Sequence, residues 1–439
     1  MTLHLEEYRS HTAPDAWFQL PAEVTVSRFF HGMRDSSNKL VEKYGTVKDM
    51  NSTVSKPIYV QKVLFGAAKE CSNEPSEPVC AFVPESPLPN DIYGEETDKH
   101  VGGIYNRPSY MGSSMVMGHV SDLRPIYKQA TELLQFNDIG TFGSQYVFSK
   151  IFGEQEIARQ IYAASESRKE SSGWPSSFPS KPSHTSIVPN ITLPEDKDYE
   201  FGIGLDYQSS IFQVMNNSAE DIRFITFNTP SIIASPSKLA ASIFAKPISL
   251  PPDLIVSPPP YAQHTVSSPN PNPPITALDT IDSDEATWND VSLATNVIVP
   301  GSSVPASLTF HGSESLLSQL WESMWFHKNS RALMRLYIRS PDGPIAAKAA
   351  AGGGDKWWDL RGGKGGVWTD KGQWLDWNEV CGAFDEEVFG DGKGEFGKES
   401  EEVGGQKVVY SAFGQVVEGK VRVEKPVPEE EKKEDGKED

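Results

Sequence analysis

The sequence predicts an α/β fold in which a mixed sheet is flanked by helices, and three stretches predict it. Residues 56–67 (KPIYVQKVLFGA) are rich in β-branched and aromatic side chains, as expected of a buried strand that ends at Gly66. Residues 109–118 (SYMGSSMVMG) form a second short apolar strand in a small-residue frame. Residues 121–136 (SDLRPIYKQATELLQF) then repeat apolar side chains at the spacing of an amphipathic helix. Strands and helices in such succession are typical of α/β proteins.

Composition limits the classes of function. The chain has 439 residues, of which 38% are hydrophobic, so it can bury a sizeable core. Its formal net charge of −20 and its pI near 4.9 argue against a surface that binds the phosphates of nucleic acid or anionic lipid. We therefore expect no nucleic-acid partner.

Further core elements follow in chain order. Residues 145–164 (QYVFSKIFGEQEIARQIYAA) predict a second helix. Residues 165–196 are rich in Ser, Pro and Lys and predict an exposed loop. Residues 200–217 return to order, and residues 221–228 (DIRFITFN) predict a strand.

The second half of the chain is more irregular. Many of the 33 prolines lie between residue 229 and about residue 300, where the missing backbone donors predict a long, partly disordered insertion. Residues 304–340 predict a strand, a turn and a long amphipathic helix, which Ser313 would cap. Glycine loops and tryptophans over 350–396 predict a compact satellite packed on a larger body, with a sugar-stacking platform as the alternative. These tryptophans are Trp357, Trp358, Trp368, Trp374 and Trp377.

These patterns predict five regions. They are a core at 1–228, a Pro-rich insertion at 229–303, a closing strand and helix of the core at 304–345, a Trp/Gly-rich region at 346–414, and an acidic disordered tail at 415–439.

Cysteines and sequons bear on the compartment. Cys71 and Cys80 bracket a polar, turn-rich octapeptide and would close one small loop in an oxidising compartment, or stay as two free thiols. Asn51, Asn190 and Asn216 stand in N-x-S/T sequons, which accept glycans in a lumenal protein and also occur by chance. The sequence shows no run of about 18 apolar residues and no signal peptide at its start, so the chain as written would be cytosolic.

Polar residues at predicted strand ends are the candidates for chemistry. Asp15 precedes the apolar pair of DAWFQLP, Asp206 follows a predicted strand in GIGLDYQ, and His311 follows one in LTFHGS. An open α/β sheet builds its ligand crevice from such strand ends. An aspartate with a histidine suits a divalent cation such as Mn²⁺. Each residue also has a structural interpretation: Asp15 and Asp206 as caps of turns or helices, and His311 as a capping or core histidine.

Four motifs, in order along the chain, resemble those of one family. They are DAWFQLPAEVTVSRF (15–29), YMGSSMVMG (110–118), LDYQSSIFQ (205–213) and HGSE (311–314). Together they resemble the glycosyltransferase domain of the lysyl hydroxylases and procollagen galactosyltransferases, in a version associated with fungal proteins. The resemblance covers residues 15–228 and 304–325.

The resemblance implies a GT-A-like fold and a nucleotide-sugar donor such as a UDP-hexose. It implies Mn²⁺ held by Asp15 and His311, with Gly312 beside the diphosphate, and transfer of a hexose to a hydroxyl of a protein or glycan. Asp206 is the expected base. The expected lining of the donor-sugar pocket is Tyr110, Ser113 and Gln145, for which close packing is the alternative. Family members act in the Golgi or endoplasmic reticulum lumen behind a type II membrane anchor.

The chain also departs from the family pattern. Thr12 stands where the family has the first acid of its D-x-x-D motif, Gly112 replaces an asparagine, and Ser144 replaces an aspartate beside Gln145. The nucleotide-binding first βαβ half, which should precede this motif, is also missing. We therefore expect either an incomplete gene product or a degenerate paralogue, and a non-catalytic scaffold or binding protein is the alternative function.

A glycan hydrolase is a third class of function. It needs two facing carboxylates. The acids beside the tryptophans, Asp355, Asp359, Asp370 and Asp376, have no spacing that would pair them. The sequence therefore places no hydrolase site.

Overall fold

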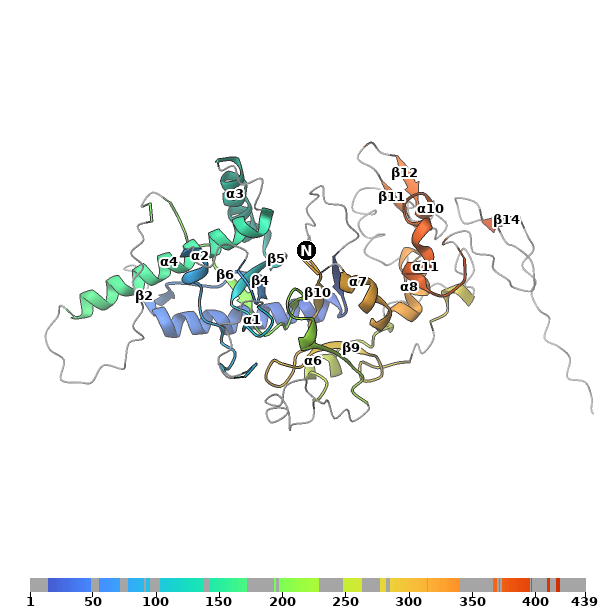
Figure 1. Cartoon of the computed structure of the whole chain (residues 1–439), viewed down its shortest axis with the longest axis horizontal. Helices are drawn as coiled ribbons and strands as arrows, with labels where there is room; N and C mark the ends of the chain where they lie inside the picture. Colours follow the sequence, from blue (N-terminus) through green and yellow to red (C-terminus); the bar gives the residue numbers. More distant parts are fainter. Residues whose placement is uncertain are drawn as a thin grey trace, which may run out of the picture. The chain divides into compact units, whose positions relative to one another are not determined.

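The computed structural model divides into two compact units (Figure 1). The first unit comprises Met1–Ser257 and Trp288–Trp325, and the second comprises Pro258–Thr287 and Phe326–Asp439. The structure describes residues 15–48, 55–71, 78–90, 92–94, 103–136, 143–171, 193–194, 197–228, 248–262, 277–281, 285–313, 315–339, 366–368, 371, 373–394, 396, 409–410 and 416–418.

A three-stranded mixed sheet lies at the centre of the first unit. Its strands are β4 (Val63–Ala68), β5 (Tyr110–Gly118), which is antiparallel to β4, and β6 (Ile203–Asp206), which is parallel to β4. Helices α3 (Val120–Phe136) and α4 (Gly143–Ser171) supply apolar side chains to the same core. This core includes Phe65, Met111, Ile126, Ile151 and Ile203. The predicted mixed α/β architecture is thus confirmed, and β4 begins later than the expected strand at 56–67.

A second three-stranded sheet has the order β1-β10-β7. Strand β10 (Ser307–Thr309) runs antiparallel to β1 (Ala16–Phe18) and parallel to β7 (Phe212–Val214). Directly after β1, the buried side-chain amide of Gln19 donates hydrogen bonds to the carbonyl oxygens of Ala294 and Pro305. The chain then enters α1 (Ala22–Tyr44) directly after Pro21.

The last part of the predicted, partly disordered insertion at 229–303 is ordered. Strand β9 (Leu293–Asn296) pairs antiparallel with β8 (Ile222–Ile225), and Leu293 and Ala294 are fully buried. The physical reason is visible in the sequence, because no proline occurs between Pro274 and Pro300 and residues 291–299 (VSLATNVIV) are rich in apolar side chains. Residues 229–247 and 263–276, where many of the prolines lie, are outside the described residues.

The predicted long helix after β10 is also wrong, because the chain breaks into short helical segments. Met324 has extended backbone, and the Trp325 indole N–H donates to the Gln19 carbonyl oxygen at 3.0 Å. Trp325 also packs edge-on against Trp288, with ring centroids 5.5 Å apart. These contacts stop one continuous helix. The segments are α7 (Ser315–Leu320), η5 (Trp321–Ser323), η6 (His327–Asn329) and α8 (Ser330–Arg339).

Helix α8 belongs to the second unit. The sequence had placed residues 304–345 in the core of the first. In its own small core, Trp377 packs in tilted geometry against Phe389 and Phe396. The Asp385 carboxylate accepts hydrogen bonds from the Trp377 indole and the Phe396 amide. Its elements include η4 (Ala277–Asp279), β11 (Gly366–Trp368), β12 (Trp374–Asp376), α10 (Trp377–Val380), η8 (Gly382–Phe384), α11 (Asp385–Phe389), β13 (Val409–Tyr410) and β14 (Val416–Glu418). The described part of the Trp/Gly-rich region is therefore compact, while Trp357 and Trp358 lie outside it.

Smaller elements complete the first unit. They are the hairpin of β2 (Thr46–Lys48) with β3 (Ser55–Pro57), α2 (Pro78–Ala81), η2 (Ala219–Asp221) and α6 (Pro252–Ile255). In the described part of the chain, no helix is long and apolar enough to cross a membrane.

Candidate functional site

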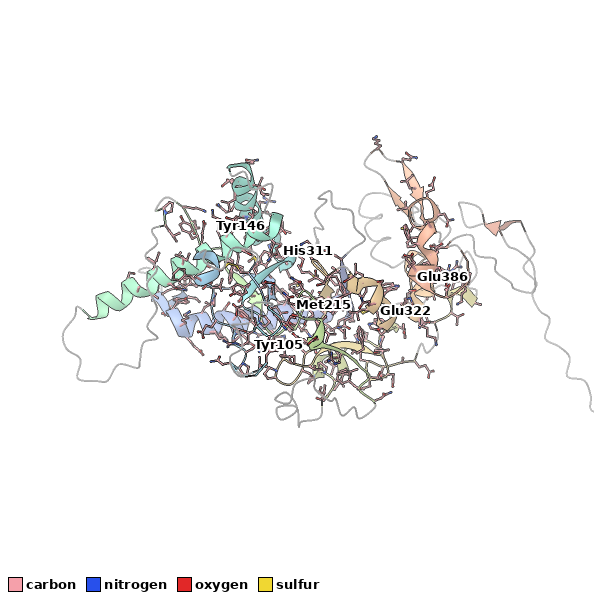
Figure 2. All side chains as sticks on the ribbon, in the orientation of Figure 1. Tyr105, Tyr146, Met215, His311, Glu322 and Glu386 are labelled. Carbon is pink, nitrogen blue, oxygen red and sulfur yellow. A yellow bond between two sulfur atoms is a disulfide. The ribbon has the colours of Figure 1, made fainter. Side chains whose placement is uncertain are left out.

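Three strand ends meet at one edge of the sheet β1-β10-β7. Because β7 and β10 are parallel and β1 is antiparallel to them, the carboxyl ends of the first two lie beside the start of β1. The Phe310 amide donates to the Asp15 carbonyl oxygen at 2.7 Å, and the Met215 amide donates to the Thr309 carbonyl oxygen at 2.9 Å. Figure 2 labels His311 and Met215 in this part of the first unit. We call Asp15, Asn216, His311, Gly312 and Ser313 the edge site.

Asp15 and His311 are brought together, although 296 positions separate them in the sequence (311 − 15). The Asp15 Oδ2 and His311 Nδ1 atoms are 3.6 Å apart, and both side chains face solvent, with 36% and 66% of their surface exposed. Two ligands of one hard cation each lie about 2.1 Å from it and thus at most about 4.2 Å from each other. The pair therefore fits a shared divalent ion, for which a carboxylate and an imidazole are suitable ligands.

Asn216 is an edge-site residue that the sequence interpretation noted only as part of a sequon. Ser313 Oγ donates to Asn216 Oδ1 at 3.5 Å, and Gly312 has a φ of 77°, a conformation that favours glycine. A Cβ atom at Gly312 would lie 3.6 Å from Asn216 Cγ. The feature of the sequence that could have indicated Asn216 is its position directly after the buried residues FQVM (212–215).

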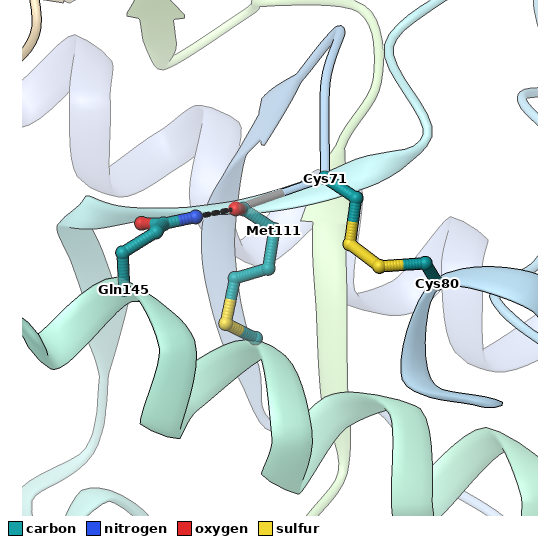
Figure 3. Close-up of a disulfide and its surroundings, with 4 residues drawn as sticks. All are labelled: Cys71, Cys80, Met111 and Gln145. Carbon is teal, nitrogen blue, oxygen red and sulfur yellow. Dashed lines mark hydrogen bonds between the residues drawn. A yellow bond between two sulfur atoms is a disulfide. The ribbon is translucent and has the colours of Figure 1, made fainter. Parts of the chain in front are cut away.

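Ser113 and Gln145 also come together, but they do so within the framework of the fold. Phe65 pairs with Val116 while Gly66 pairs with Gly112, so residues 113–115 form a bulge in β5. From the first turn of α4, Gln145 Oε1 accepts a hydrogen bond from the Ser113 amide at 2.7 Å. Figure 3 shows the second bond, in which Gln145 Nε2 donates to the Met111 carbonyl oxygen. The Gln145 side chain thus pairs with the bulged strand as a neighbouring backbone would.

Tyr110 and the bulge lie at different places along β5. Tyr110 pairs with Ala68 at the end of β4. The Ser114 hydroxyl, by contrast, accepts a hydrogen bond from Thr309 Oγ1 at 3.0 Å and connects the bulge to β10. Tyr110 and Ser113 are the two β5 residues expected to line the sugar pocket. Of these, Ser113 is adjacent to Ser114, which contacts β10.

Asp206 has the contacts of a loop cap, which was the alternative interpretation. Its buried carboxylate accepts hydrogen bonds from the Ser210 amide and hydroxyl and from the amides of Ile211 and Phe212, at 2.7 to 3.1 Å. These bonds shape the turn between β6 and β7. Because both carboxylate oxygens of Asp206 already accept hydrogen bonds from backbone amides, we do not retain Asp206 as the catalytic base.

A buried ion pair that the sequence gave no reason to expect holds the segment that follows Asn216. Lys69 Nζ lies 2.8 Å from Asp221 Oδ2, donates to the Ile104 carbonyl oxygen at 2.6 Å, and stands 4.3 Å from the centre of the Tyr93 ring. Burial lowers the pKa of Lys69 and raises the pKa of Asp221, although each partner opposes the shift of the other. Asp221 ends the segment that starts at Asn216, so the pair fixes that segment to the end of β4.

A disulfide joins Cys71 to Cys80, as one of the two interpretations expected (Figure 3). It ties the chain beyond β4 to α2. The adjacent Glu70 carboxylate accepts a hydrogen bond from Asn217 Nδ2 at 2.7 Å, which gives the disulfide-bonded loop a second connection to the segment after β7.

Compared with known proteins, the chain matches no family model, no curated protein and no solved structure. Among the described residues, no group of three or more His, Cys, Asp or Glu side chains gathers where it could hold a metal ion. Thr12 lies outside these residues. The edge site therefore offers a divalent ion two side-chain ligands from the described part of the chain, and water or ligand oxygens would have to complete the coordination.

Proposed function

We propose that this protein is a nucleotide-sugar-dependent glycosyltransferase of GT-A-like type, which transfers a hexose from a donor such as a UDP-hexose to a hydroxyl of a protein or glycan. The observation that carries the proposal is the Asp15–His311 pair at the meeting point of three strand ends. The same two residues are those onto which the family's metal ligands carry over.

The chemistry of the reaction suits this pair. A nucleoside diphosphate leaves with negative charge, and a bound divalent cation would neutralise that charge as the glycosidic bond breaks. Asp15 and His311 would hold the cation from one side, while the phosphates and water supply the remaining oxygen ligands. Both side chains are partly exposed, so a ligand can reach them from the solvent.

The disulfide supports the lumen of the endoplasmic reticulum or Golgi as the place of action. Disulfides persist in oxidising compartments and are rare in the cytosol. The acidic composition fits a protein whose partners are sugars and proteins rather than nucleic acid.

A second candidate is a non-catalytic binding scaffold of the same architecture, and one observation favours it. Gln145 and Asp206, two residues expected to act on the donor or acceptor, already use their polar atoms on the backbone of the fold. A scaffold of this kind would bind a nucleotide or glycan without transfer.

Calorimetry on the full chain tests the proposal. We expect UDP-glucose or UDP-galactose to release heat with Mn²⁺ and none when EDTA removes the metal, and His311→Ala to weaken binding at least about tenfold. His119→Ala is the matched control, because the His119 side chain is also exposed and forms hydrogen bonds with nearby Ser121. Binding without release of free UDP over long incubation would favour the scaffold, and no heat with any common donor would contradict the glycosyltransferase.

A further inference from the structure

Asn216 lies partly exposed in the turn that follows β7. The Ser218 amide donates to the Met215 carbonyl oxygen at 2.9 Å, and the Asp221 amide donates to the Ser218 carbonyl oxygen at 3.1 Å. These bonds fold residues 215–221 into two consecutive turns, in which Met215 and Ser218 are buried while Asn216 reaches solvent. The fold thus keeps Asn216 at the surface of the first unit.

The side-chain nitrogen of Asn216 is not used by the described part of the chain. Asn216 Oδ1 accepts one long hydrogen bond, from Ser313 Oγ at 3.5 Å, and Asn216 Nδ2 donates to none of the residues that the structure describes. The neighbouring Asn217 differs, because its Nδ2 donates to the Glu70 carboxylate at 2.7 Å. Of the two adjacent amides, that of Asn216 is therefore the one available for a bond to another molecule.

The sequence motif and the disulfide agree on what that bond is. Residues 216–218 (NNS) form an N-x-S sequon, the pattern of an N-glycan acceptor in a secretory compartment. The disulfide of the first unit is typical of the same oxidising surroundings. The other two sequons, at Asn51 and Asn190, lie outside the described residues. Asn216 is thus the acceptor candidate whose surroundings the structure describes.

We propose that Asn216 carries an N-linked glycan, and that this glycan covers the edge site. Asn216 bonds to Ser313, two positions after His311, so a glycan on Nδ2 starts beside the Asp15–His311 pair. N-glycans are bulky and lie on the surface. A glycan here hinders a nucleotide on its way to the pair. This second half rests on the proposed function, because it concerns access to the same cation site.

The modification is a group transfer to Asn216 Nδ2. The host's oligosaccharide-transferring enzyme supplies the oligosaccharide as a lipid diphosphate. A bond forms between Nδ2 and C1 of the first sugar, the bond from C1 to the diphosphate oxygen breaks, and Nδ2 gives up one proton as the lipid diphosphate leaves. The sequon also needs the hydroxyl of Ser218, which is buried in the folded chain. Transfer therefore precedes closure of the turn.

Site-resolved mass spectrometry tests the acceptor on the full chain, secreted from a eukaryotic host behind a signal peptide. We expect a glycan on Asn216 and its loss in both Asn216→Gln and Ser218→Ala. Asn217→Gly is the matched control, because it keeps the sequon and because glycine tolerates the φ of 57° at this position. An unmodified Asn216 in secreted, disulfide-bonded protein would overturn the proposal.

A second arm measures the effect on the edge site by uptake of Mn²⁺ in the presence of UDP. An endoglycosidase that leaves one sugar on Asn216 shortens the glycan without creating a carboxylate. We expect the shortened form and Asn216→Gln to take up Mn²⁺ at least about threefold more tightly than the fully glycosylated protein. The same treatment of Asn216→Gln should change nothing.

The outcomes of the two arms separate the proposals. Equal Mn²⁺ uptake by the glycosylated, shortened and Asn216→Gln proteins would overturn the covering of the edge site. No uptake by any of them would contradict the glycosyltransferase and, with it, the covering, while the mass of the Asn216 peptide would still decide whether Asn216 is an acceptor.

Discussion

Lys69 keeps its ammonium group inside the first unit, where its side chain has no exposed surface. Replacing it with methionine would leave the Asp221 carboxylate buried without its cation. Breaking a buried pair on one side costs about 3–5 kcal/mol of the free energy of unfolding, so we expect a loss of this size for Lys69→Met at pH 7 by chemical denaturation.

The pH dependence of that variant follows from the direction of the Asp221 shift. Burial raises the pKa of Asp221 above its ordinary value, and loss of Lys69 removes a group that lowers it. As pH falls, Asp221 therefore takes up a proton in the folded state at a higher pH than in the unfolded state. The Lys69→Met variant should thus regain stability as pH falls toward the ordinary carboxylate pKa of about 4. Lys62→Met is the control, since Lys62 is exposed and lies 3.9 Å from Asp122, and it should change stability by less than about 1 kcal/mol.

Asp391 gives the opposite pH dependence in the second unit. Burial opposes its ionisation, but hydrogen bonds from Arg331 and the Lys393 amide prevail and hold its pKa below the usual range. Its stabilisation is therefore present above the unfolded-state pKa and lost as pH falls through the lower folded-state pKa.

We expect Asp391→Asn to lower the melting temperature of the second unit at pH 7, by a loss of about 1 kcal/mol after allowance for solvent screening. The difference from the unaltered protein should shrink below about pH 4, as measured by scanning calorimetry. Exposed Glu387, changed to Gln, serves as the control. A difference that stays constant from pH 7 to pH 3 would refute the role of the Asp391 charge.

Among the elements, the bulged strand β5 depends on a single side chain of α4. Gln145→Ala would leave the Ser113 amide and the Met111 carbonyl oxygen without this partner, at a cost of about 1–3 kcal/mol. Hydrogen exchange should accelerate at the Ser113 amide. Gln160→Ala is the matched control on the same helix, because Gln160 Nε2 donates to the Phe82 carbonyl oxygen and touches no residue of β5 in the bonds described. Unchanged protection at Ser113 would show that Gln145 does not hold the bulge.

Elements with strong local patterns were predictable, and those fixed by distant contacts were not. The apolar spacing of α3 and the small-residue run of β5 determine their own conformation, so both appear where the sequence predicts them. The helix expected after Ser313 breaks because Trp325 bonds to Gln19, about 300 residues earlier, which no local pattern can reveal. Strand β9 was assigned to the insertion because the prolines on both sides of it dominated the composition of that region.

The same division applies to the candidate site. Asp15 and His311 were predictable because motif order suggested that they meet, and the structure places them 3.6 Å apart. Asn216 was missed as an edge-site residue because its neighbours there come from elsewhere in the chain, and Lys69 was missed because a lysine after an apolar strand is usually exposed.

At the scale of the whole molecule, the disulfide is the covalent restraint on the first unit. The two cysteines are 9 positions apart. By the loss of chain entropy in the unfolded state, a crosslink of this length raises the free energy of unfolding by about 2–3 kcal/mol. A reducing agent, or the double change Cys71→Ser with Cys80→Ser, should lower the denaturant midpoint of the first unit accordingly. Cys381→Ser, which removes the free thiol, should leave it unchanged. Equal midpoints in oxidised and reduced protein would contradict a stabilising disulfide.

The central claim is that Asp15 and His311 together hold a divalent cation for a nucleoside diphosphate. Electron paramagnetic resonance of free Mn²⁺ during titration with the full chain and UDP measures this most directly. We predict that the protein removes the free-Mn²⁺ signal in the presence of UDP, and that Asp15→Asn and His311→Ala each weaken this uptake at least about tenfold while His119→Ala does not. Uptake that is equal in all four proteins would place the cation elsewhere and contradict the account.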